Sequence, residues 1–522
     1  MRIKINQGLG YPGLLGLIIQ KKIQVTVKIN NMNNPNYPSL YQINTRVLLT
    51  ELSQNLGRRA TLDDIPDITL DRFAEMGFDW IWFLSVWRTG ELARKVSREN
   101  PEWRHDFENT LPDLQDKDIA GSGFAITGYT VHPDLGGDEA LKRLRDRLRK
   151  RGLKLMLDFV PNHMGPDHPW VEEHPDYFVS GTENDLEESP QNYKRVKRKK
   201  GDLILAYGRD PFFAGWSDTV QLDYSNPATA EAMLGEILRI SGQCDGVRCD
   251  MAMLVLPEVF EKTWGRRAES FWPVVTKAVR EKVPGFCFMA EVYWDMEWTM
   301  QQQGFDYAYD KRLYDRLIEG HARAVREHFY AKPDYQDKLA RFLENHDEPR
   351  AAATFDQKNH EAAALITFLS PGLRIFHQGQ FEGRKKRISP HLVRAPQEQI
   401  VEAIQEFYSR LLSIIKENVF RDGWWELLKC SPAWLGNGTW DSFLTFAWED
   451  TKGSRALVTV NYAPHNSQCY VHLPFTDMAG KSVRFMDMIS PAVYERNGCE
   501  LLSKGMYLDL PAWGYHIFEV GS

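Results

Sequence analysis

The stretch GGDEALKRLRDRLRKRGLKLMLDFVPNHMG, residues 136–165, decides the fold class of this chain. Leu141, Leu144 and Leu148 recur there at helical spacing among Lys and Arg, and a glycine follows where such a helix should end. The apolar run LKLMLDFV, residues 153–160, is typical of a strand buried on both faces. A helix that leads directly into a buried strand is the βαβ arrangement of a parallel sheet.

The same alternation extends in both directions from this stretch. Eight apolar or mixed runs of strand length occur, and each except the third is followed by helix-like sequence. They are INTRVLLTEL (43–52), GFDWIWFLSVW (77–87), LKLMLDFV (153–160), CDGVRCDMAM (244–253), GFCFMAEVYW (285–294), GFDYAYD (304–310), LARFLENHD (339–347) and PGLRIFHQGQ (371–380). We therefore predict an α/β fold with a catalytic (β/α)8 TIM barrel over residues 41–423.

Three further segments lie outside the barrel pattern. Residues 1–40 form a predicted N-terminal extension, poorly ordered and Asn-rich towards its end. A polar stretch over residues 161–226 interrupts the repeat after the third strand and is interpreted as an inserted subdomain at the barrel mouth. Period-2 apolar runs dominate residues 424–522 and predict a C-terminal antiparallel β-sandwich domain.

Composition limits the compartment and the partners. The formal net charge is −7, so the chain as a whole lacks the basic footprint of a nucleic-acid-binding protein. Six of the seven residues 194–200 are basic, which favours a solvated loop and leaves an anionic ligand as the alternative. The six cysteines have no CxxC or zinc spacing, and the apolar run at residues 8–19 is too short to span a membrane. We predict a cytoplasmic protein without membrane contact.

Titratable residues gather where the predicted strands end, which is the catalytic face of such barrels. Asp250 and Glu291 end the fourth and fifth strands. Two carboxyl groups on neighbouring strand ends are what retaining glycoside hydrolysis requires. Arg248 lies two residues before Asp250, on the same side of its strand, and can keep that carboxylate ionised. The apolar and aromatic surroundings of Glu291 favour its neutral form. His346 and Asp347 end the seventh strand and can bind ring hydroxyls.

The sequence resembles the α-amylase family, glycoside hydrolase family 13, over roughly residues 41–522. Four short segments carry the resemblance in the family's order: LDFVPNHMG, DGVRCDMAM, MAEVYW and FLENHDEPR. The resemblance implies Asp250 as nucleophile, Glu291 as acid/base and Asp347 as stabiliser of the transition state.

Further site residues follow from the same segments. They are expected to bind an α-linked glucose oligosaccharide and comprise Tyr129, His163, Arg248, His346, Tyr293, Trp294 and Arg350. The segment TGYTVHPDLGG makes Tyr129 the expected stacking platform beneath the sugar. Tyr293 and Trp294, beside the acid, are expected either to form an aromatic acceptor platform or to pack under the barrel rim.

Two positions concern substrate length and metal. Many amylases carry Lys-His after the nucleophile, whereas this chain has Met253 and Leu254, which favours a short oligosaccharide or disaccharide. Asn162 matches a position that often binds calcium in the family, so a structural calcium is possible although the chemistry needs no cofactor. Its further candidate ligands are Asp167, Glu172, Glu173 and Asp176.

Three functions remain open at this point. The first is a retaining hydrolase of starch- or glycogen-like oligosaccharides, and the second is a transglycosylase or disaccharide isomerase that uses the same residues. The third is a non-catalytic carbohydrate-binding protein. If the basic run at residues 194–200 approaches the mouth, phosphorylated sugars become candidate substrates.

Overall fold

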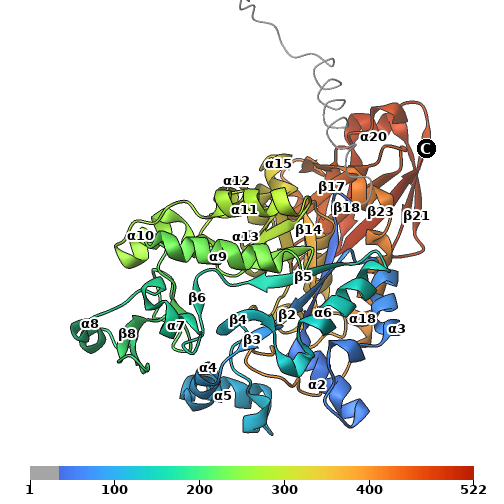
Figure 1. Cartoon of the computed structure of the whole chain (residues 1–522). Coiled ribbons are helices and arrows are strands. Elements are labelled where there is room, and N and C mark those ends of the chain that lie inside the picture. Colours follow the sequence, from blue (N-terminus) through green and yellow to red (C-terminus); the bar gives the residue numbers. More distant parts are fainter. Residues whose placement is uncertain (1–34, 522) are drawn as a thin grey trace, which may run out of the picture. The chain divides into compact units, whose positions relative to one another are not determined.

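The structure is a computed structural model, and it describes residues 35–521. Most of the predicted extension, residues 1–40, lies outside this range. Eight parallel strands form a closed barrel in the order β1-β2-β5-β10-β11-β12-β13-β14 (Figure 1). Their bounds are β1 (Ser39–Asn44), β2 (Trp80–Leu84), β5 (Lys154–Phe159), β10 (Gly246–Cys249), β11 (Cys287–Ala290), β12 (Tyr307–Tyr309), β13 (Leu339–Phe342) and β14 (Leu373–His377). The predicted TIM barrel is confirmed.

The first strand differs from its prediction. The run INTRVLLTEL was expected to be extended, but the strand ends at Asn44 and α2 (Thr45–Leu56) follows at once. The Asn44 side chain accepts a hydrogen bond from the Val47 amide, so it caps the helix. The prediction of a strand over residues 43–52 was therefore wrong, because a good N-cap begins a helix inside the apolar run.

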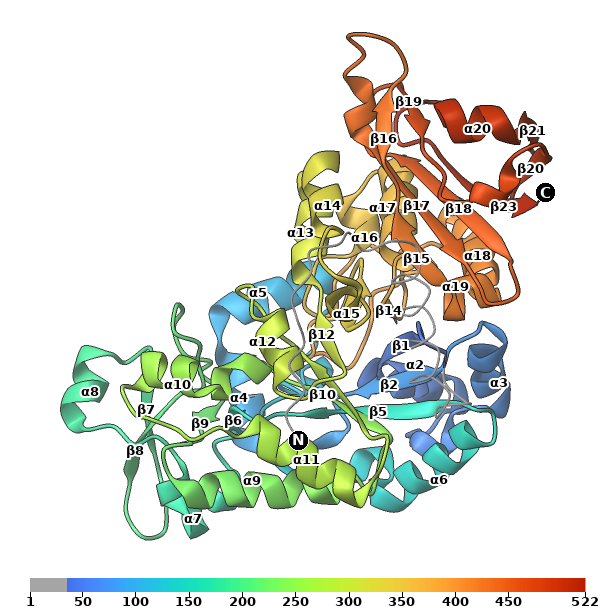
Figure 2. The same cartoon turned by 90° about the horizontal axis from the view of Figure 1, so that it is seen from above.

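Helices follow the strands and cover the barrel. In Figures 1 and 2, α9 and α11 lie side by side, and their residues are in contact. Two helices, α4 (Glu91–Glu99) and α5 (Pro101–Thr110), lie between β3 (Trp87–Thr89) and β4 (Ile126–Val131). The remaining helices of the barrel region are α3 (Asp67–Glu75), α6 (Gly137–Arg149), α9 (Pro227–Ile240), α10 (Pro257–Trp264), α11 (Trp272–Lys282), α12 (Glu297–Gln302), α13 (Lys311–Glu319), α14 (Ala322–His328), α15 (Pro333–Gln336), α16 (Ala351–Thr354), α17 (Gln357–Phe368), α18 (Glu402–Ile415) and α19 (Asn418–Asp422).

The polar stretch after the third barrel strand folds as an insertion between β5 and α9. It contains β6 (His163–Met164), α7 (Trp170–Glu173), α8 (Glu183–Glu188), β7 (Tyr193–Val196), β8 (Leu203–Ala206) and β9 (Val220–Gln221). Part of the basic run is strand β7, paired with β8, rather than the expected loop. The Lys194 ammonium donates to Ser217 O, and Arg195 pairs with Glu183. These two cations therefore have partners within the insertion.

The C-terminal region forms two antiparallel sheets, as predicted. One sheet has six strands and the other has three. The six are β15 (Trp424–Leu427), β17 (Phe443–Glu449), β18 (Arg455–Asn461), β23 (Tyr515–Gly521), β20 (Ser482–Asp487) and β21 (Val493–Asn497), with α20 (Gly498–Lys504) after β21. The three are β16 (Cys430–Pro432), β19 (Ser467–Val471) and β22 (Met506–Leu510).

Strand β17 joins this domain to the barrel. Leu444, Phe446 and Trp448 belong to the core cluster that includes the barrel strands, whereas Phe443 and Ala447 belong to the core between the two sheets. Side chains alternate along a strand, so β17 is buried on both faces. The Trp448 indole also donates to Leu369 O at 2.9 Å. One face of the six-stranded sheet therefore belongs to the core of the barrel, whereas its other face packs in a separate core between the two sheets.

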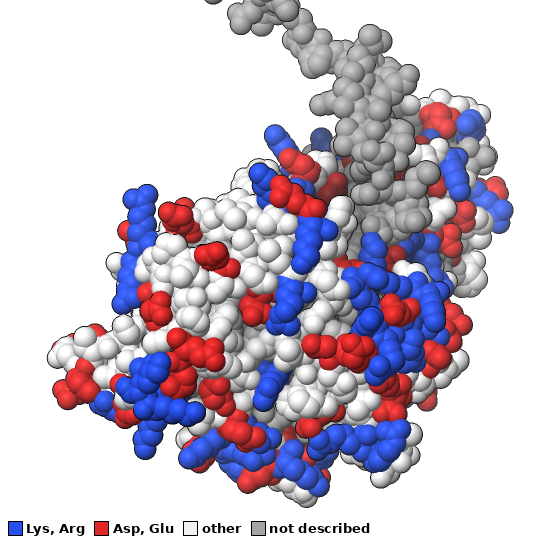
Figure 3. Space-filling view, in the orientation of Figure 1, with Lys and Arg blue, Asp and Glu red and all other residues white. Residues whose placement is uncertain are grey.

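The outer surface carries both charges. On the face drawn in Figure 3, Lys and Arg are intermingled with Asp and Glu. Within residues 35–521, no helix is long and apolar enough to cross a membrane. The six cysteines are all free thiols in this structure, and five of them are buried.

Candidate active site

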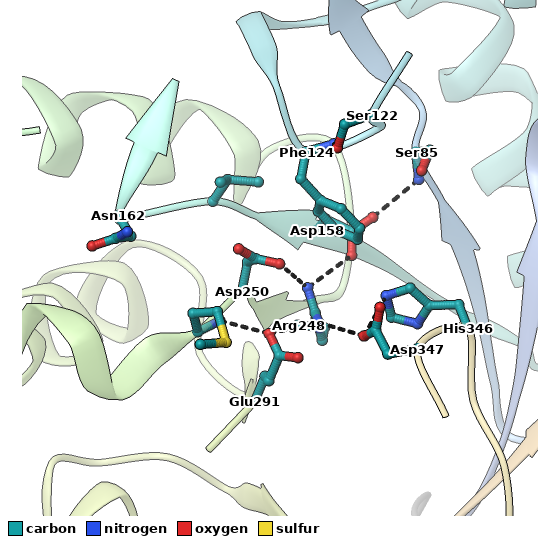
Figure 4. Close-up of polar contacts among 12 residues, drawn as sticks. Ser85, Ser122, Phe124, Asp158, Asn162, Arg248, Asp250, Glu291, His346 and Asp347 are labelled. Carbon is teal, nitrogen blue, oxygen red and sulfur yellow. Dashed lines mark hydrogen bonds and ion pairs between the residues drawn. The ribbon is translucent and has the colours of Figure 1, made fainter. Parts of the chain in front are cut away.

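Arg248 lies at the centre of the predicted site, at the carboxyl end of β10 (Figure 4). Its side chain is buried, with Nη1 donating to Asp250 Oδ1 at 2.6 Å and Nη2 lying 2.7 Å from Glu291 Oε2. Nη1 lies 3.9 Å from Asp158 Oδ1, and Nη2 lies 3.9 Å from Asp347 Oδ2. One guanidinium therefore gathers four carboxyl groups that come from four strand ends.

Parallel pairing explains this convergence. Arg248 is level with Asp158 of β5 on one side and with Met289 of β11 on the other. The chain turns directly after the nucleophile candidate, because Met251 has a left-handed φ of 42°. This turn directs the Met251 amide at Glu291 Oε2, at 2.7 Å. Such strained backbone is frequent where a site fixes its geometry.

Burial raises the pKa of Glu291, Asp158 and Asp347. It raises the pKa of Glu291 to about 8, against the opposing effect of Arg248 and with a further rise from the Asp250 and Asp347 carboxylates. Glu291 therefore carries its proton at neutral pH. The Tyr293 hydroxyl donates to Glu291 Oε1 at 2.9 Å and holds the carboxyl group in place. Burial also raises the pKa of Asp158 to about 7, although Arg248 and the Ser85 amide oppose the shift.

The loop after β13 supplies Asp347 and His346. Asn345 Oδ1 accepts from the amides of Asp347 and Glu348, which fixes the loop. His346 Nε2 lies 3.1 Å from Asp347 Oδ2, and its Nδ1 lies 2.7 Å from the Gln42 amide nitrogen. Burial holds the pKa of His346 well below its usual value, so the ring is neutral. The Asp347 carboxyl is 40 % exposed and is the most accessible of the three acidic candidates.

His163 is buried at the start of β6, where the insertion begins. Its ring packs against Trp216, with centroids 5.1 Å apart. Burial lowers its pKa, and the Asp250 carboxylate opposes that shift. A neutral imidazole near the nucleophile candidate can donate to or accept from a sugar hydroxyl.

The Tyr129 prediction was wrong. The ring is 1 % exposed and packs between Trp87 and Phe159. Its hydroxyl donates to Val160 O and accepts from the Val160 amide, both at 2.9 Å. A side chain enclosed in this way braces the end of β5 and cannot stack on a sugar.

Phe124, five residues earlier, lies beside the acidic cluster, where the stacking platform was expected. Its half-buried ring lies 5.2 Å from the Arg248 guanidinium carbon and 5.5 Å from the His346 ring centroid (Figure 4). Sequence reasoning missed it, together with Trp82 and Tyr309, which also contact Arg248. The signal available was an aromatic residue between the glycine-rich turn at 121–123 and the following strand.

Arg350 does not reach the acidic cluster. The residue is 2 % exposed, its Nη1 donates to Glu344 Oε1 at 2.5 Å, and its Nη2 donates to Gln378 O at 2.9 Å. The prediction that Arg350 contacts substrate is therefore wrong for this structure. The buried Glu344 carboxylate, two residues before His346, pairs with Arg350 instead and also accepts from the Ala351 amide.

The aromatic residues beside Glu291 have two different environments. Tyr293 is half-buried and bonded to Glu291, whereas Trp294 is 39 % exposed. The Trp294 ring meets the exposed Phe212 ring of the insertion edge-on, with centroids 5.0 Å apart. Met253 and Leu254, after the nucleophile candidate, are buried and present no polar group to a ligand.

The oxygens of the calcium candidates have protein partners in part. The Asn162 amide oxygen accepts from the Gln221 side-chain amide at 3.0 Å, whereas Asp167 Oδ1 is buried without a hydrogen-bond partner among the described residues. Asp167 accepts from the Leu92 amide, and Glu172 accepts from the Lys199 amide. Within the described part of the chain, no three His, Cys, Asp or Glu residues gather around a point that could hold a metal ion.

The comparisons with known proteins agree with this geometry. The family model for the α-amylase catalytic domain matches residues 68–411. The chain belongs to the α-amylase family. The four motifs of the sequence, from LDFVPNHMG to FLENHDEPR, lie within the matched range.

Curated relatives of the family match in part. An α-1,4-glucan:maltose-1-phosphate maltosyltransferase of Salinibacter ruber is 37 % identical over 145 residues, 26 % of this chain and 20 % of the relative. The trehalose synthase/amylase TreS of Mycobacterium tuberculosis is 30 % identical over 208 residues, 35 % and 32 % of the two chains. The α-amylase MalA of Haloarcula japonica is 23 % identical over 361 residues, 67 % and 49 %. The matches thus span about half or less of these relatives.

Solved structures of the family share the fold. A maltogenic α-amylase, AmyB of Thermotoga neapolitana, aligns with a TM-score of 0.64 at 19 % identity, covering 94 % of this chain and 99 % of that one. An α-amylase of Geobacillus thermoleovorans, solved in complex with acarbose, has the same TM-score and coverage at 18 % identity. At such identities these likenesses establish the fold alone.

Proposed function

We propose that this family member is a retaining enzyme that acts on α-glucosidic bonds of short α-linked glucose oligosaccharides through a glucosyl-enzyme. One observation carries the proposal: the Arg248 guanidinium binds Asp250 and Glu291 with adjacent nitrogens. Both carboxyl groups are thereby held close together, as the retaining separation of about 5–5.5 Å requires. Their environments differ, and this difference supports separate roles.

Asp250 is the proposed nucleophile. Its carboxylate accepts a hydrogen bond from Arg248, which orients the group for attack on the anomeric carbon. Glu291, with its pKa raised to about 8, donates its proton to the leaving oxygen. It then takes a proton from the incoming hydroxyl, of water or of a second sugar. The covalent bond to Asp250 forms in the first step and breaks in the second.

Asp347, His346 and His163 surround the attacked sugar in this proposal. The Asp347 carboxyl is the accessible one, so it can bind ring hydroxyls and strengthen that contact as positive charge develops. Phe124 supplies the apolar face on which the ring rests. Met253 and Leu254, after the nucleophile, are buried and offer no polar contacts to further sugars of a long substrate, which supports a short one.

Transfer to a sugar acceptor is the second candidate, and the exposed Trp294 and Phe212 pair favours it. Two aromatic faces beside the acid can hold a sugar where a hydrolase would admit water. Relatives in this family are named as a maltosyltransferase and as a trehalose synthase, which supports the same alternative.

A product analysis separates these functions. The purified protein is incubated with maltose and maltotriose, and the products and their anomeric form are followed by NMR and mass spectrometry. Initial products with retained α configuration support the proposal, and inverted products contradict it. Only shorter sugars indicate hydrolysis, whereas longer or rearranged sugars indicate transfer. Sugar binding without turnover across a panel of α-glucosides would favour a non-catalytic binding protein.

A further inference from the structure

A second cavity, of about 370 Å³, lies beside α2 and shares none of its lining residues with the acidic cluster. Its walls come from α2, α4, the turn before α4 and the segments around residues 117–120 and 132–135. Five Lys or Arg residues line it, against two carboxylates. The five are Arg46, Arg59, Arg94, Arg98 and Lys117. An excess of three positive charges around one small cavity is unusual in a chain whose net charge is −7.

Both carboxylates of the cavity are already neutralised. Glu91 pairs with Arg94, and Asp134 pairs with Arg59. Among the described residues, the other three cations form no ion pair with an acid. Arg98 Nε donates to Ile119 O at 3.3 Å and acts on Glu91 at longer range, and Lys117 acts on Asp118 in the same way. The excess charge therefore stands on Arg46, Arg98 and Lys117.

Arg46 gives the strongest indication of an absent counter-charge. The residue is 8 % exposed, with Nη1 donating to Gly121 O at 2.6 Å and to Pro390 O at 3.4 Å, and Nη2 to Thr89 Oγ1 at 3.2 Å. All three acceptors are neutral, and no acid among the described residues pairs with Arg46. Burial lowers its pKa to about 10. A guanidinium withdrawn from water without a counter-charge is costly unless an anion joins it.

The positive charges around the cavity also act on His132. Burial is the main reason why the pKa of His132 is lowered, and Arg46, Arg88 and Arg94 lower it further. Asp134 alone acts in the opposite direction. The cavity is thus a place of positive potential, which attracts and concentrates small anions.

We propose that this cavity binds a small phosphorylated ligand, with its phosphoryl group between Arg46, Arg98 and Lys117. Guanidinium groups match the oxygens of a phosphoryl group with two parallel hydrogen bonds, and a lysine adds a point charge. The cavity volume lies within the range of small-molecule sites, about 300–1,000 Å³. Leu49, Ala60 and Leu135 give it an apolar wall for the remainder of such a ligand.

The test measures binding of three probes, inorganic phosphate, pyrophosphate and glucose 1-phosphate, by titration calorimetry at low salt. The full chain carries Asp250→Asn, so turnover does not contribute and the outcome is independent of the proposed reaction. Arg98→Ala combined with Lys117→Ala removes two of the unpaired cations. Lys95→Ala, an exposed cation of the same helix that does not line the cavity, is the matched control.

We expect at least one probe to bind, with an affinity about tenfold or more lower in the Arg98→Ala/Lys117→Ala variant. Lys95→Ala should leave the affinity within about twofold, because Lys95 is paired with Glu99 and does not line the cavity. Thermal melting without ligand confirms that each variant is folded. The proposal is overturned if no probe binds, if the double variant binds as tightly as the parent chain, or if Lys95→Ala weakens binding equally.

Discussion

At the scale of single residues, the proton on Glu291 decides the pH dependence of the reaction. Burial raises its pKa to about 8, so the group is protonated below that pH and loses its proton above it. We therefore expect kcat/KM to fall about tenfold per pH unit above pH 8. Measuring kcat/KM against pH, with an α-glucoside that has a poor leaving group as substrate, tests this decline.

The Glu291→Gln variant provides the control for that assignment. It should lose at least about 10²-fold in rate on the poor leaving group. An α-glucosyl fluoride needs little protonation, so its first step should survive in this variant. If kcat/KM of the Glu291→Gln variant still falls above pH 8, another group is responsible for the decline.

Arg248 is the residue on which the site depends for stability as well as activity. It is buried and lies close to Asp158, Asp250, Glu291 and Asp347. Arg248→Met leaves these buried acids without their cation, so we expect the free energy of unfolding to drop by ~3–5 kcal/mol. Turnover should vanish. Urea unfolding of Arg248→Met and Arg248→Lys checks this prediction. We expect a smaller loss of stability for the lysine variant. An unchanged stability in Arg248→Met would refute the central role of Arg248.

At the scale of elements, the segment that leads into β4 distinguishes a ligand platform from a structural brace. Phe124→Ala removes the ring that faces Arg248, so kcat/KM should fall roughly tenfold or more while the stability changes little. Tyr129→Phe removes a buried hydroxyl with two hydrogen bonds, so the stability should fall by about 1–3 kcal/mol with kcat/KM unchanged. Steady-state kinetics and thermal melts of both variants test the pair. The reverse pattern would restore Tyr129 as the platform.

The same segment shows what the sequence could and could not predict. The four motifs fixed which acids meet, because strand ends of a parallel barrel share one face and side chains alternate towards it. Phe124 and Tyr129 are both aromatic and five residues apart, and only the path of the turn at 121–123 decides which one faces the mouth. Arg350 was predicted from its place beside His-Asp, but its partner Glu344 had no visible signal in the sequence. Asn44 was likewise a readable N-cap within a run that was interpreted as strand.

At the scale of the whole molecule, β17 links the stability of the barrel to that of the C-terminal domain. Trp448 is buried in the core cluster of the barrel and donates to Leu369 O. We expect Trp448→Ala to lower the free energy of unfolding by ~3–5 kcal/mol, in a single transition, because the two domains share that core. Trp434→Ala, at a position that is 55 % exposed, is the control and should change it by less than about 0.5 kcal/mol. Two separate transitions in the parent chain would show that the domains unfold independently.

The barrel as a whole brings three acids together around Arg248, and we propose that one of them, Asp250, forms a covalent bond to the sugar. An α-glucosyl fluoride with a second, ring fluorine slows the breakdown of such an intermediate. Peptide mass spectrometry of the inactivated enzyme should find the glucosyl adduct on Asp250, and Asp250→Asn should remain unlabelled. An adduct on another residue, or inverted products with no adduct at all, would contradict the account.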